Sequence, residues 1–397
     1  MNSELIALTS MSNGSGIELI DIDRCSQGFT SFKNCMAEPG CICQVSSGSS
    51  SFSGEGGSGD FLAVAQSKKP VVHVYQWGKP QAHFQCHTQE IVTSITSFLT
   101  FLVGGTKRGW IYLWDVSTGS LLRTWQAHFK SVNRLYVTKD SQFIISASGD
   151  GIGKVWDISK VMDASEDLAG PQAGRGASRS GAYRSWNPHT LPIKDMHVVD
   201  ALGVIRVITC SLDKTIVMYD VHNGQQCLRL SLPEALEAVV SSPSEDFIMA
   251  GGSSGSIFRI DSSVASAAMS AMFTSSVVVG TDRHRNIGNA HLRGGVWEGH
   301  TSLGATIPGR GVDVVNHPSI FETLTGHIKA VTALMFSKNN TTLVSASEDG
   351  TLRTWNVWTK QCLHQCTPMN KCGISNALVS MSEPILSTIL RLRCDVL

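Results

Sequence analysis

Short segments of alternating apolar and polar residues run along nearly the whole chain, separated by turns rich in Gly, Ser, Asn and Asp. Alternation with a period of two indicates β-strands, and no long stretch shows the period of a helix. One strand type recurs, ending in an aromatic or aliphatic residue followed by a polar one. Its seven copies are Ile20-Asp21, Tyr75-Gln76, Trp114-Asp115, Trp156-Asp157, Tyr219-Asp220, Ile260-Asp261 and Trp355-Asn356. The pattern predicts an all-β protein built from one repeated unit.

Three of these copies share further polar residues at regular spacing. An Asp lies six residues before the terminal aromatic residue, and a His lies 22 or 24 residues before that Asp. The three sets are His128, Asp150 and Trp156, then His189, Asp213 and Tyr219, then His327, Asp349 and Trp355. A His, a hydroxyl, an Asp in a tight turn and a strand Trp can satisfy one another's hydrogen bonds, each contributing roughly 1 kcal/mol net. We expect these nine residues, together with Trp114 and Asp115, to form structural networks.

The repeat length agrees with this interpretation. The intervals from Tyr75 to Trp114, from Trp114 to Trp156 and from Tyr219 to Ile260 are 39, 42 and 41 residues. The longer intervals contain three expected insertions, at 46–59, 158–188 and 262–318. Without these segments and a tail at 383–397, about 280 residues remain, which is about 40 for each of seven copies.

The two ends of the repeat array are predicted to depend on each other. Strands are expected near residues 4–9 and 16–22, but this first unit lacks an innermost strand. An orphan strand is expected at Gly373 to Ser380. Its pairing with the N-terminal strands would complete one unit and cover edges that would otherwise be open. The sequence therefore predicts one domain over residues 1–382.

Several of these motifs resemble a known family. Gly326-His327, the run from Ser345 to Gly350 and Trp355-Asn356 resemble the Gly-His to Trp-Asp signature of WD repeats. The stretch from Trp186 to Asp261 and the segment from Leu113 to Gly119 resemble the WD repeat-containing protein 18 family. The resemblance implies a seven-bladed WD40 β-propeller, closed by pairing of the N- and C-terminal strands in one blade.

The resemblance also implies a function. The family is the WD-repeat subunit of the nucleolar Rix-type complex, a non-catalytic scaffold for pre-60S ribosome maturation and removal of the internal spacer from rRNA. Implied partners are two helical-repeat scaffold proteins and an AAA-type remodelling ATPase, with indirect contact to pre-ribosomal RNA and a further link to DNA replication licensing. The implied location is the nucleolus and nucleoplasm, with the cytoplasm as an additional one. Relatives end in a helical segment that could mediate self-association and that the terminal Asp395-Val396-Leu397 does not resemble, so the sequence leaves self-association open.

Charge and composition fit a folded protein without a membrane segment. The 32 basic and 32 acidic side chains cancel, so no overall attraction to nucleic acid or to an anionic membrane is expected. The N-terminus does not resemble a secretory signal, and the apolar window Val264 to Val279 is too short and too interrupted by Ser for a membrane span. The 11 cysteines are scattered and odd in number, which favours reduced thiols.

Possible catalytic, cofactor and metal sites have simpler explanations. The His and Asp residues repeat in three units, whereas an enzyme needs one catalytic triad. The run Gly54 to Gly59 matches a dinucleotide fingerprint by letter, but a strand and not a helix follows it. Cysteines and a histidine also cluster without the paired spacing of zinc sites, at Cys41, Cys43, Cys362, His364, Cys366 and Cys372. We therefore expect no catalytic, cofactor or metal site, and a protein that is not an enzyme.

Two alternatives remain open from the sequence. Residues 171–187 are locally basic and could contact RNA phosphates, although a solvated loop is the favoured interpretation. A generic WD-repeat adaptor in signalling or ubiquitin ligation is the second function considered. Trp114-Asp115 and Trp156-Asp157 are both followed by x-Ser and not by x-Arg, which weakens the interpretation as a cullin-type substrate receptor.

Overall fold

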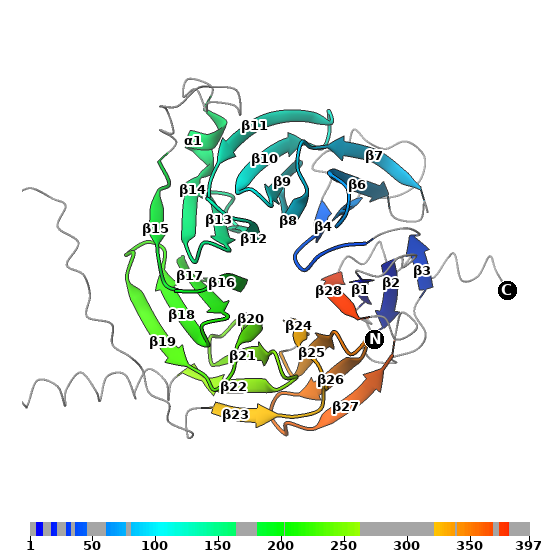
Figure 1. Cartoon of the computed structure of the whole chain (residues 1–397), viewed down its shortest axis with the longest axis vertical. Coiled ribbons are helices and arrows are strands. Elements are labelled where there is room, and N and C mark those ends of the chain that lie inside the picture. Colours follow the sequence, from blue (N-terminus) through cyan, green and yellow to red (C-terminus); the bar gives the residue numbers. More distant parts are fainter. Residues whose placement is uncertain are drawn as a thin grey trace, which may run out of the picture.

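The computed structural model describes residues 5–10, 17–21, 29–32, 36–45, 61–76, 81–163, 181–201, 203–262, 321–337, 340–367 and 373–380. Within these residues, 28 strands form seven four-stranded antiparallel sheets, accompanied by one short helix. Figure 1 shows the sheets arranged around a common centre in chain order, an arrangement typical of β-propellers.

We name the sheets A to G and give their strands from the innermost to the outermost. Sheet A contains β28 (Ile374–Ser380), β1 (Leu5–Ser10), β2 (Ile17–Asp21) and β3 (Phe29–Phe32). Sheet B contains β4 (Ile42–Val45), β5 (Phe61–Ala65), β6 (Val71–Gln76) and β7 (Ala82–His87). Sheet C contains β8 (Val92–Phe98), β9 (Phe101–Thr106), β10 (Trp110–Asp115) and β11 (Ser120–Gln126).

The other four sheets follow the same order. Sheet D contains β12 (Val132–Val137), β13 (Phe143–Ser148), β14 (Gly153–Asp157) and β15 (Arg184–Trp186). Sheet E contains β16 (Ile193–Ala201), β17 (Val204–Ser211), β18 (Thr215–Asp220) and β19 (Gln226–Ser231). Sheet F contains β20 (Leu236–Ser241), β21 (Phe247–Gly252), β22 (Ile257–Asp261) and β23 (Phe321–Leu324). Sheet G contains β24 (Val331–Phe336), β25 (Thr342–Ser347), β26 (Leu352–Asn356) and β27 (Cys362–Cys366).

Sheet A brings together the two ends of the described chain. The strand β28 pairs antiparallel with β1, with Leu5 opposite Ser380 and Leu8 opposite Ala377. The hydroxyl of Ser375 donates to the backbone oxygens of Thr9 and Ala37, at 3.0 and 2.6 Å. The C-terminal strand is thus the innermost strand of the sheet that contains the N-terminal strands.

Burial follows the position of each strand within its sheet. Every residue of the second strands β5, β13 and β21 is buried, whereas the outer strand β27 is almost wholly exposed. The apolar side chains form clusters between neighbouring sheets: one cluster joins Ile111 and Leu113 of sheet C to Val132 and Ile144 of sheet D. Burying one such aliphatic side chain contributes about 1.5–3 kcal/mol, so packing between sheets holds the sheets in order.

The expected insertion at 158–188 differs from the observed arrangement at both of its ends. It begins with the short helix α1 (Ile158–Met162), which Asp157 caps by accepting a hydrogen bond from the backbone N–H of Ser159. It ends with β15, which pairs with β14 and completes sheet D. The strand was missed because its three residues, Arg-Ser-Trp, are too few to show alternation. The expected insertion 46–59, the tail 383–397 and all of 262–318 except Ser262 lie outside the described residues.

Candidate functional site

Sheet D brings together His128, Asp150 and Trp156 through a fourth residue, Ser146. The His128 Nδ1 atom lies 3.2 Å from Asp150 Oδ2, and its Nε2 atom lies 2.8 Å from Ser146 Oγ. The indole N–H of Trp156 donates to the same Ser146 Oγ at 3.0 Å. The loop before β12, the strands β13 and β14 and the turn between them are therefore joined by one hydrogen-bonded chain.

The hydrogen bonds of this chain have one consistent direction. An ionised Asp150 only accepts, so His128 Nδ1 carries the proton and donates to it. The Nε2 atom of the neutral ring then accepts from the Ser146 hydroxyl, whose oxygen accepts from Trp156. Burial lowers the pKa of His128, against the attraction of Asp150, and so keeps the ring neutral at pH 7.

Asp150 also fastens the turn of sheet D to the preceding loop. Its carboxylate accepts from the backbone N–H of Ile152 at 3.0 Å and of Phe129 at 3.3 Å. Burial alone would raise the pKa of Asp150, but the hydrogen bonds from His128 and from these two backbone groups lower it to about 2. The carboxylate is therefore ionised throughout the neutral range, as an acceptor of several hydrogen bonds must be.

Sheet G repeats the arrangement with His327, Asp349, Trp355 and Ser345. The three linking distances are 3.1 Å from His327 Nδ1 to Asp349 Oδ2, 2.7 Å from His327 Nε2 to Ser345 Oγ and 2.8 Å from Trp355 Nε1 to Ser345 Oγ. Burial raises the pKa of Asp349, but hydrogen bonds from the Thr351 hydroxyl and from backbone N–H groups outweigh it and lower the pKa to about 2.

Sheet E contains a related but shorter chain. His189 Nδ1 lies 3.1 Å from Asp213 Oδ2, and Nε2 lies 2.9 Å from Thr209 Oγ1, which takes the place of the serine. Tyr219 does not join this chain: its hydroxyl donates to Gln226 at 3.3 Å, and its ring stacks on Trp186 at 5.4 Å between centroids. A tyrosine at the tryptophan position places its polar group at the far end of the ring, beyond reach of Thr209.

Trp114 and Asp115 lie in sheet C, apart from these chains. Trp114 is buried and stacks on Tyr112, with centroids 5.5 Å apart. Asp115 accepts from the backbone N–H and the hydroxyl of Ser117, at 2.9 and 2.7 Å, and from the hydroxyl of Thr118. Asp115 therefore stabilises the exposed turn after β10.

The described networks are unsuited to nucleophilic catalysis. The Ser146 and Ser345 side chains are fully buried, and each hydroxyl oxygen already accepts a hydrogen bond from a tryptophan. A serine nucleophile must reach a substrate carbonyl while its base takes the proton, which this packing prevents. Each of the three arrangements connects a loop, a strand and a turn by hydrogen bonds.

A buried ion pair between innermost strands was not predicted from the sequence. Arg134 on β12 donates through Nε to Asp195 Oδ1 on β16 at 2.5 Å. The other carboxylate oxygen of Asp195 accepts from the backbone N–H of Val239 on β20 at 2.9 Å. Asp195 thus connects three neighbouring sheets at their inner edges, with only 12% of its side chain exposed. The sequence did not single out either residue, because both strands also contain other polar residues, such as Asn133 in β12 and Lys194 in β16.

Two further features are absent from the described part of the chain. No group of three or more His, Cys, Asp or Glu residues there is arranged to hold a metal ion. Among the same residues, no helix has both the length and the apolar character needed to cross a membrane.

Comparisons with known proteins agree with the repeats. The family described as "WD domain, G-beta repeat" matches residues 119–157 and 319–356. Each match spans the outer strand of one sheet and the three inner strands of the next, β11 with β12–β14 and β23 with β24–β26. In both matches the sequence repeat is therefore offset from the sheet by one strand, so that one repeat contributes strands to two neighbouring sheets.

Curated relatives include WD repeat-containing protein 18 and pre-rRNA-processing proteins. The chain is 28% identical to WD repeat-containing protein 18 of Bos taurus over 331 residues, which is 82% of this chain and 64% of that protein. It shows the same identity and coverage with the Homo sapiens protein, so the chain spans about 64% of the length of these relatives. It is also 29% identical to the pre-rRNA-processing protein IPI3 of Scheffersomyces stipitis, over 51% of this chain and 43% of that protein.

A solved structure shares the fold. The computationally designed Ika8 protein aligns with a TM-score of 0.55 at 19% identity, over 94% of this chain and 89% of that one. The likeness extends over nearly all of both chains and concerns the fold alone. The repeat matches and the named relatives show that the chain contains WD repeats and is similar to WD repeat-containing protein 18.

Proposed function

We propose that the chain is a non-catalytic scaffold subunit in pre-60S ribosome maturation, acting in processing of the rRNA internal spacer. The observation that carries this proposal is the combined similarity to WD repeat-containing protein 18 and to IPI3, whose name states a role in pre-rRNA processing. Under this proposal the chain works in the nucleolus and nucleoplasm. Its partners are helical-repeat scaffold proteins and an AAA-type ATPase, and a link to DNA replication licensing is a further part of the same hypothesis.

The architecture that we propose for this role is a closed, seven-bladed propeller over residues 1–382. Seven sheets and the pairing of β28 with β1 support it. A ring closed by its own termini needs no partner to cover a sheet edge at the junction, so its loops and rims are available for binding. The networks of sheets D, E and G then serve to hold those loops in place.

Depletion of the protein tests the function. We expect precursors of large-subunit rRNA that retain the internal spacer to accumulate, and re-expression of the full chain to restore their processing. Normal precursor levels after efficient depletion would contradict the proposal. Affinity purification of the tagged full chain addresses the alternative, because recovery of cullin adaptors or receptor-associated proteins in place of ribosome-assembly factors would favour a generic adaptor.

A further inference from the structure

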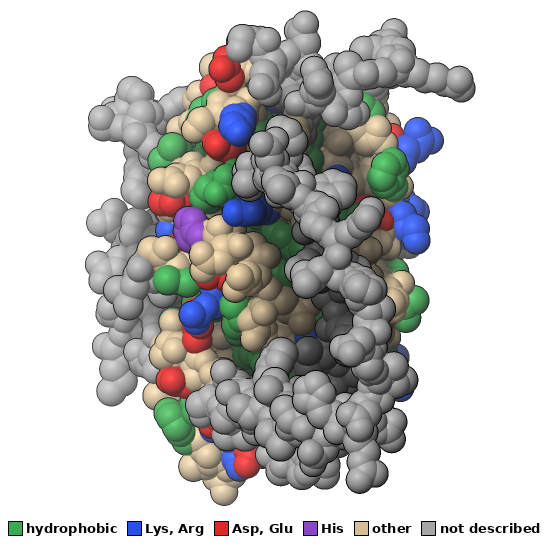
Figure 2. Space-filling model, turned by 90° about the vertical axis from the view of Figure 1, so that its left-hand side faces the viewer, with side chains coloured by type: hydrophobic (Ala, Val, Ile, Leu, Met, Phe, Trp, Pro, Cys, Tyr) green, Lys and Arg blue, Asp and Glu red, His purple; other side chains and the backbone are tan. Residues whose placement is uncertain are grey.

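One face of the described molecule carries an exposed apolar residue beside several cations. The loops that precede the innermost strands lie on this face, together with the turns between the second and third strands of each sheet. Neighbouring pieces are in contact: the backbone N–H groups of Ala127 and His128 both donate to the Gly109 oxygen, and Gly151 packs against His189. The backbone N–H of Thr88 likewise donates to the Pro70 oxygen and joins sheet B to sheet C, so the surface across sheets B to E on this face is continuous. Figure 2, an edge-on view, shows basic and hydrophobic side chains projecting along its right-hand edge.

We call six residues of this surface the Phe129 patch. They are Lys69, Lys107, Arg108, Phe129, Lys130 and Leu191. Phe129 is 85% exposed and Leu191 is 47% exposed. Phe129 directly follows the buried His128, and Leu191 lies two residues after the buried His189. A large exposed apolar side chain flanked by polar groups is a frequent anchor in protein–protein binding.

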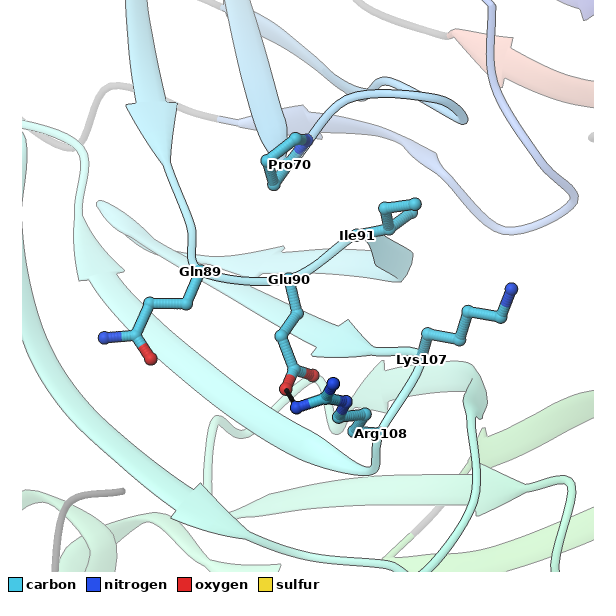
Figure 3. A pocket seen from close by; sticks show the side chains of 6 residues that line it. All are labelled: Pro70, Gln89, Glu90, Ile91, Lys107 and Arg108. Atoms are coloured by element: carbon cyan, nitrogen blue, oxygen red, sulfur yellow. Dashed lines mark ion pairs between the residues drawn. The ribbon is translucent and has the colours of Figure 1, made fainter. Parts of the chain in front are cut away.

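A pocket adjoins the patch, between the turn after β5, the loop before β8 and the turn after β9. It has a volume of about 430 Å³ and is lined by Pro70, Gln89, Glu90, Ile91, Lys107 and Arg108. Figure 3 shows Glu90 and Arg108 facing each other across its lower side, where Arg108 Nη1 lies 3.4 Å from Glu90 Oε1. The other oxygen of Glu90 is buried and has no hydrogen-bond partner among the described residues. A ligand in the pocket would lie beside this carboxylate.

The exposed charges of the patch are positive. Lys69, Lys107, Arg108 and Lys130 are all exposed. The nearby carboxylates are less exposed than these cations: Glu38 and Glu90 are both partly buried. Asp150 is already occupied by His128 and backbone N–H groups. The outer layer is therefore complementary to carboxylates, while a ligand inside the pocket would meet the Glu90 carboxylate.

These features select a peptide over a nucleic acid. A phosphate backbone could pair with the lysines, but its closely spaced negative charges would lie near the Glu90 carboxylate of the pocket. A peptide provides backbone N–H donors, side-chain carboxylates and an apolar side chain together. We propose that the Phe129 patch and its pocket bind an acidic segment of a partner protein, with an aromatic or aliphatic side chain packed against Phe129. The inference rests on the proposed scaffold function and names the chemistry of one of its partners.

The chain contains a matched control surface. Ile328 occupies the equivalent loop position before β24 and is 83% exposed, and Lys329 follows it as Lys130 follows Phe129. The adjoining turn, Ser253 to Ser256, is uncharged, in contrast to Lys107 and Arg108. The two loops therefore share their backbone position and exposure but differ in their cationic surroundings.

Selection from a random peptide display library tests the proposal on the full-length chain. We expect the enriched peptides to be rich in Asp and Glu around a Phe, Trp or Leu. In fluorescence anisotropy, a labelled peptide of the enriched sequence should bind at least about tenfold more weakly to the double variant Phe129→Ser, Lys130→Glu. Binding to Ile328→Ser, Lys329→Glu should be unchanged, and binding to the wild type should weaken as salt is raised. Both double variants change exposed side chains, and equal melting temperatures would show that they fold.

Three outcomes would overturn the assignment. They are enrichment of uncharged or basic peptides, equal binding of the enriched peptide to both double variants, and displacement of the peptide by single-stranded oligouridylate whose own binding is lost in the Phe129 variant. The last result would identify a nucleic-acid surface. These readouts do not depend on rRNA processing, so failure of the patch leaves the depletion result of the scaffold proposal intact, and the reverse is equally true.

Discussion

Sheets C and D are neighbours with the same pairing, but different chemistry holds them. In sheet D, Ser146 lies opposite Lys154 and connects His128 to Trp156. In sheet C, Gly104 lies opposite Tyr112 at the equivalent place. Trp114 fills the space there: a Cβ on Gly104 would lie 2.7 Å from the Trp114 ring. One sheet is fastened by hydrogen bonds and the other by aromatic packing.

The difference shows which interactions the fold requires. Both sheets keep four strands and contribute to the same apolar cluster, so the network is not needed to form the sheet. It adds a local connection between the loop and the turn. Where that connection is absent, the turn of sheet C carries Lys107 and Arg108 in place of an aspartate, and their charges are exposed at the surface. The loss of a fastener in sheet C thus coincides with the cationic part of the Phe129 patch.

The largest effect is expected from giving sheet D the residue that sheet C carries. Ser146→Gly leaves His128 Nε2 and the Trp156 indole N–H without their partner in a buried place. An unsatisfied buried polar group costs about 1–3 kcal/mol, so we expect a loss of about 2–5 kcal/mol in the free energy of unfolding. Urea unfolding of the purified variant measures it.

The reciprocal change is the control for this exchange. Gly104→Ser pushes a side chain into the Trp114 ring and should also destabilise, by about 1–3 kcal/mol through overpacking. Two losses would mean that each sheet is adapted to its own chemistry. A loss below about 1 kcal/mol for Ser146→Gly would show that the hydrogen-bonded chain of sheet D adds little.

The repeat pattern made much of this comparison accessible from the sequence. The spacing of His128, Asp150 and Trp156 indicated one local unit because all three lie within the three consecutive strands β12 to β14 and the loop before them. Strand alternation likewise indicated an all-β chain because half-buried strands leave a period of two. Such local patterns survive in the sequence because the interacting residues keep constant distances along it.

Other features had no comparable signal. Arg134 and Asp195 meet across 61 residues, and their contact depends on how sheets D and E are placed relative to each other. The aromatic position of sheet E was assigned to its network by analogy with the tryptophans, but the position of a hydroxyl on a phenol ring decides otherwise for Tyr219. The exposure of Phe129 could not be predicted from the sequence either, because a phenylalanine next to a buried histidine is expected to be part of the core.

A smaller effect is expected at the turn of sheet G. Asp349→Ala removes the acceptor for His327 and for the backbone N–H groups of Ile328 and Thr351. We expect the free energy of unfolding to fall by about 1–3 kcal/mol, measured by urea unfolding. Glu348→Ala changes the exposed neighbour in the same turn and should stay within about 0.5 kcal/mol of the wild type. Equal stability of the two variants would contradict a structural role for Asp349.

The smallest expected effect is a difference between sheets G and C in how their local stability depends on pH. Burial lowers the pKa of His327 below 6.5 despite the attraction of Asp349, so folding favours the neutral ring. This contribution is complete above about pH 6.5 and is lost as the pH falls through the folded pKa, because the unfolded histidine then binds a proton more readily. Sheet C contains no histidine. Hydrogen exchange, corrected for its intrinsic pH dependence, should therefore show protection falling more between pH 7 and pH 5 in β25 than in β9. An equal decline in both strands would mean that acid acts on the whole ring at once, and that the histidine networks are not separate local fasteners.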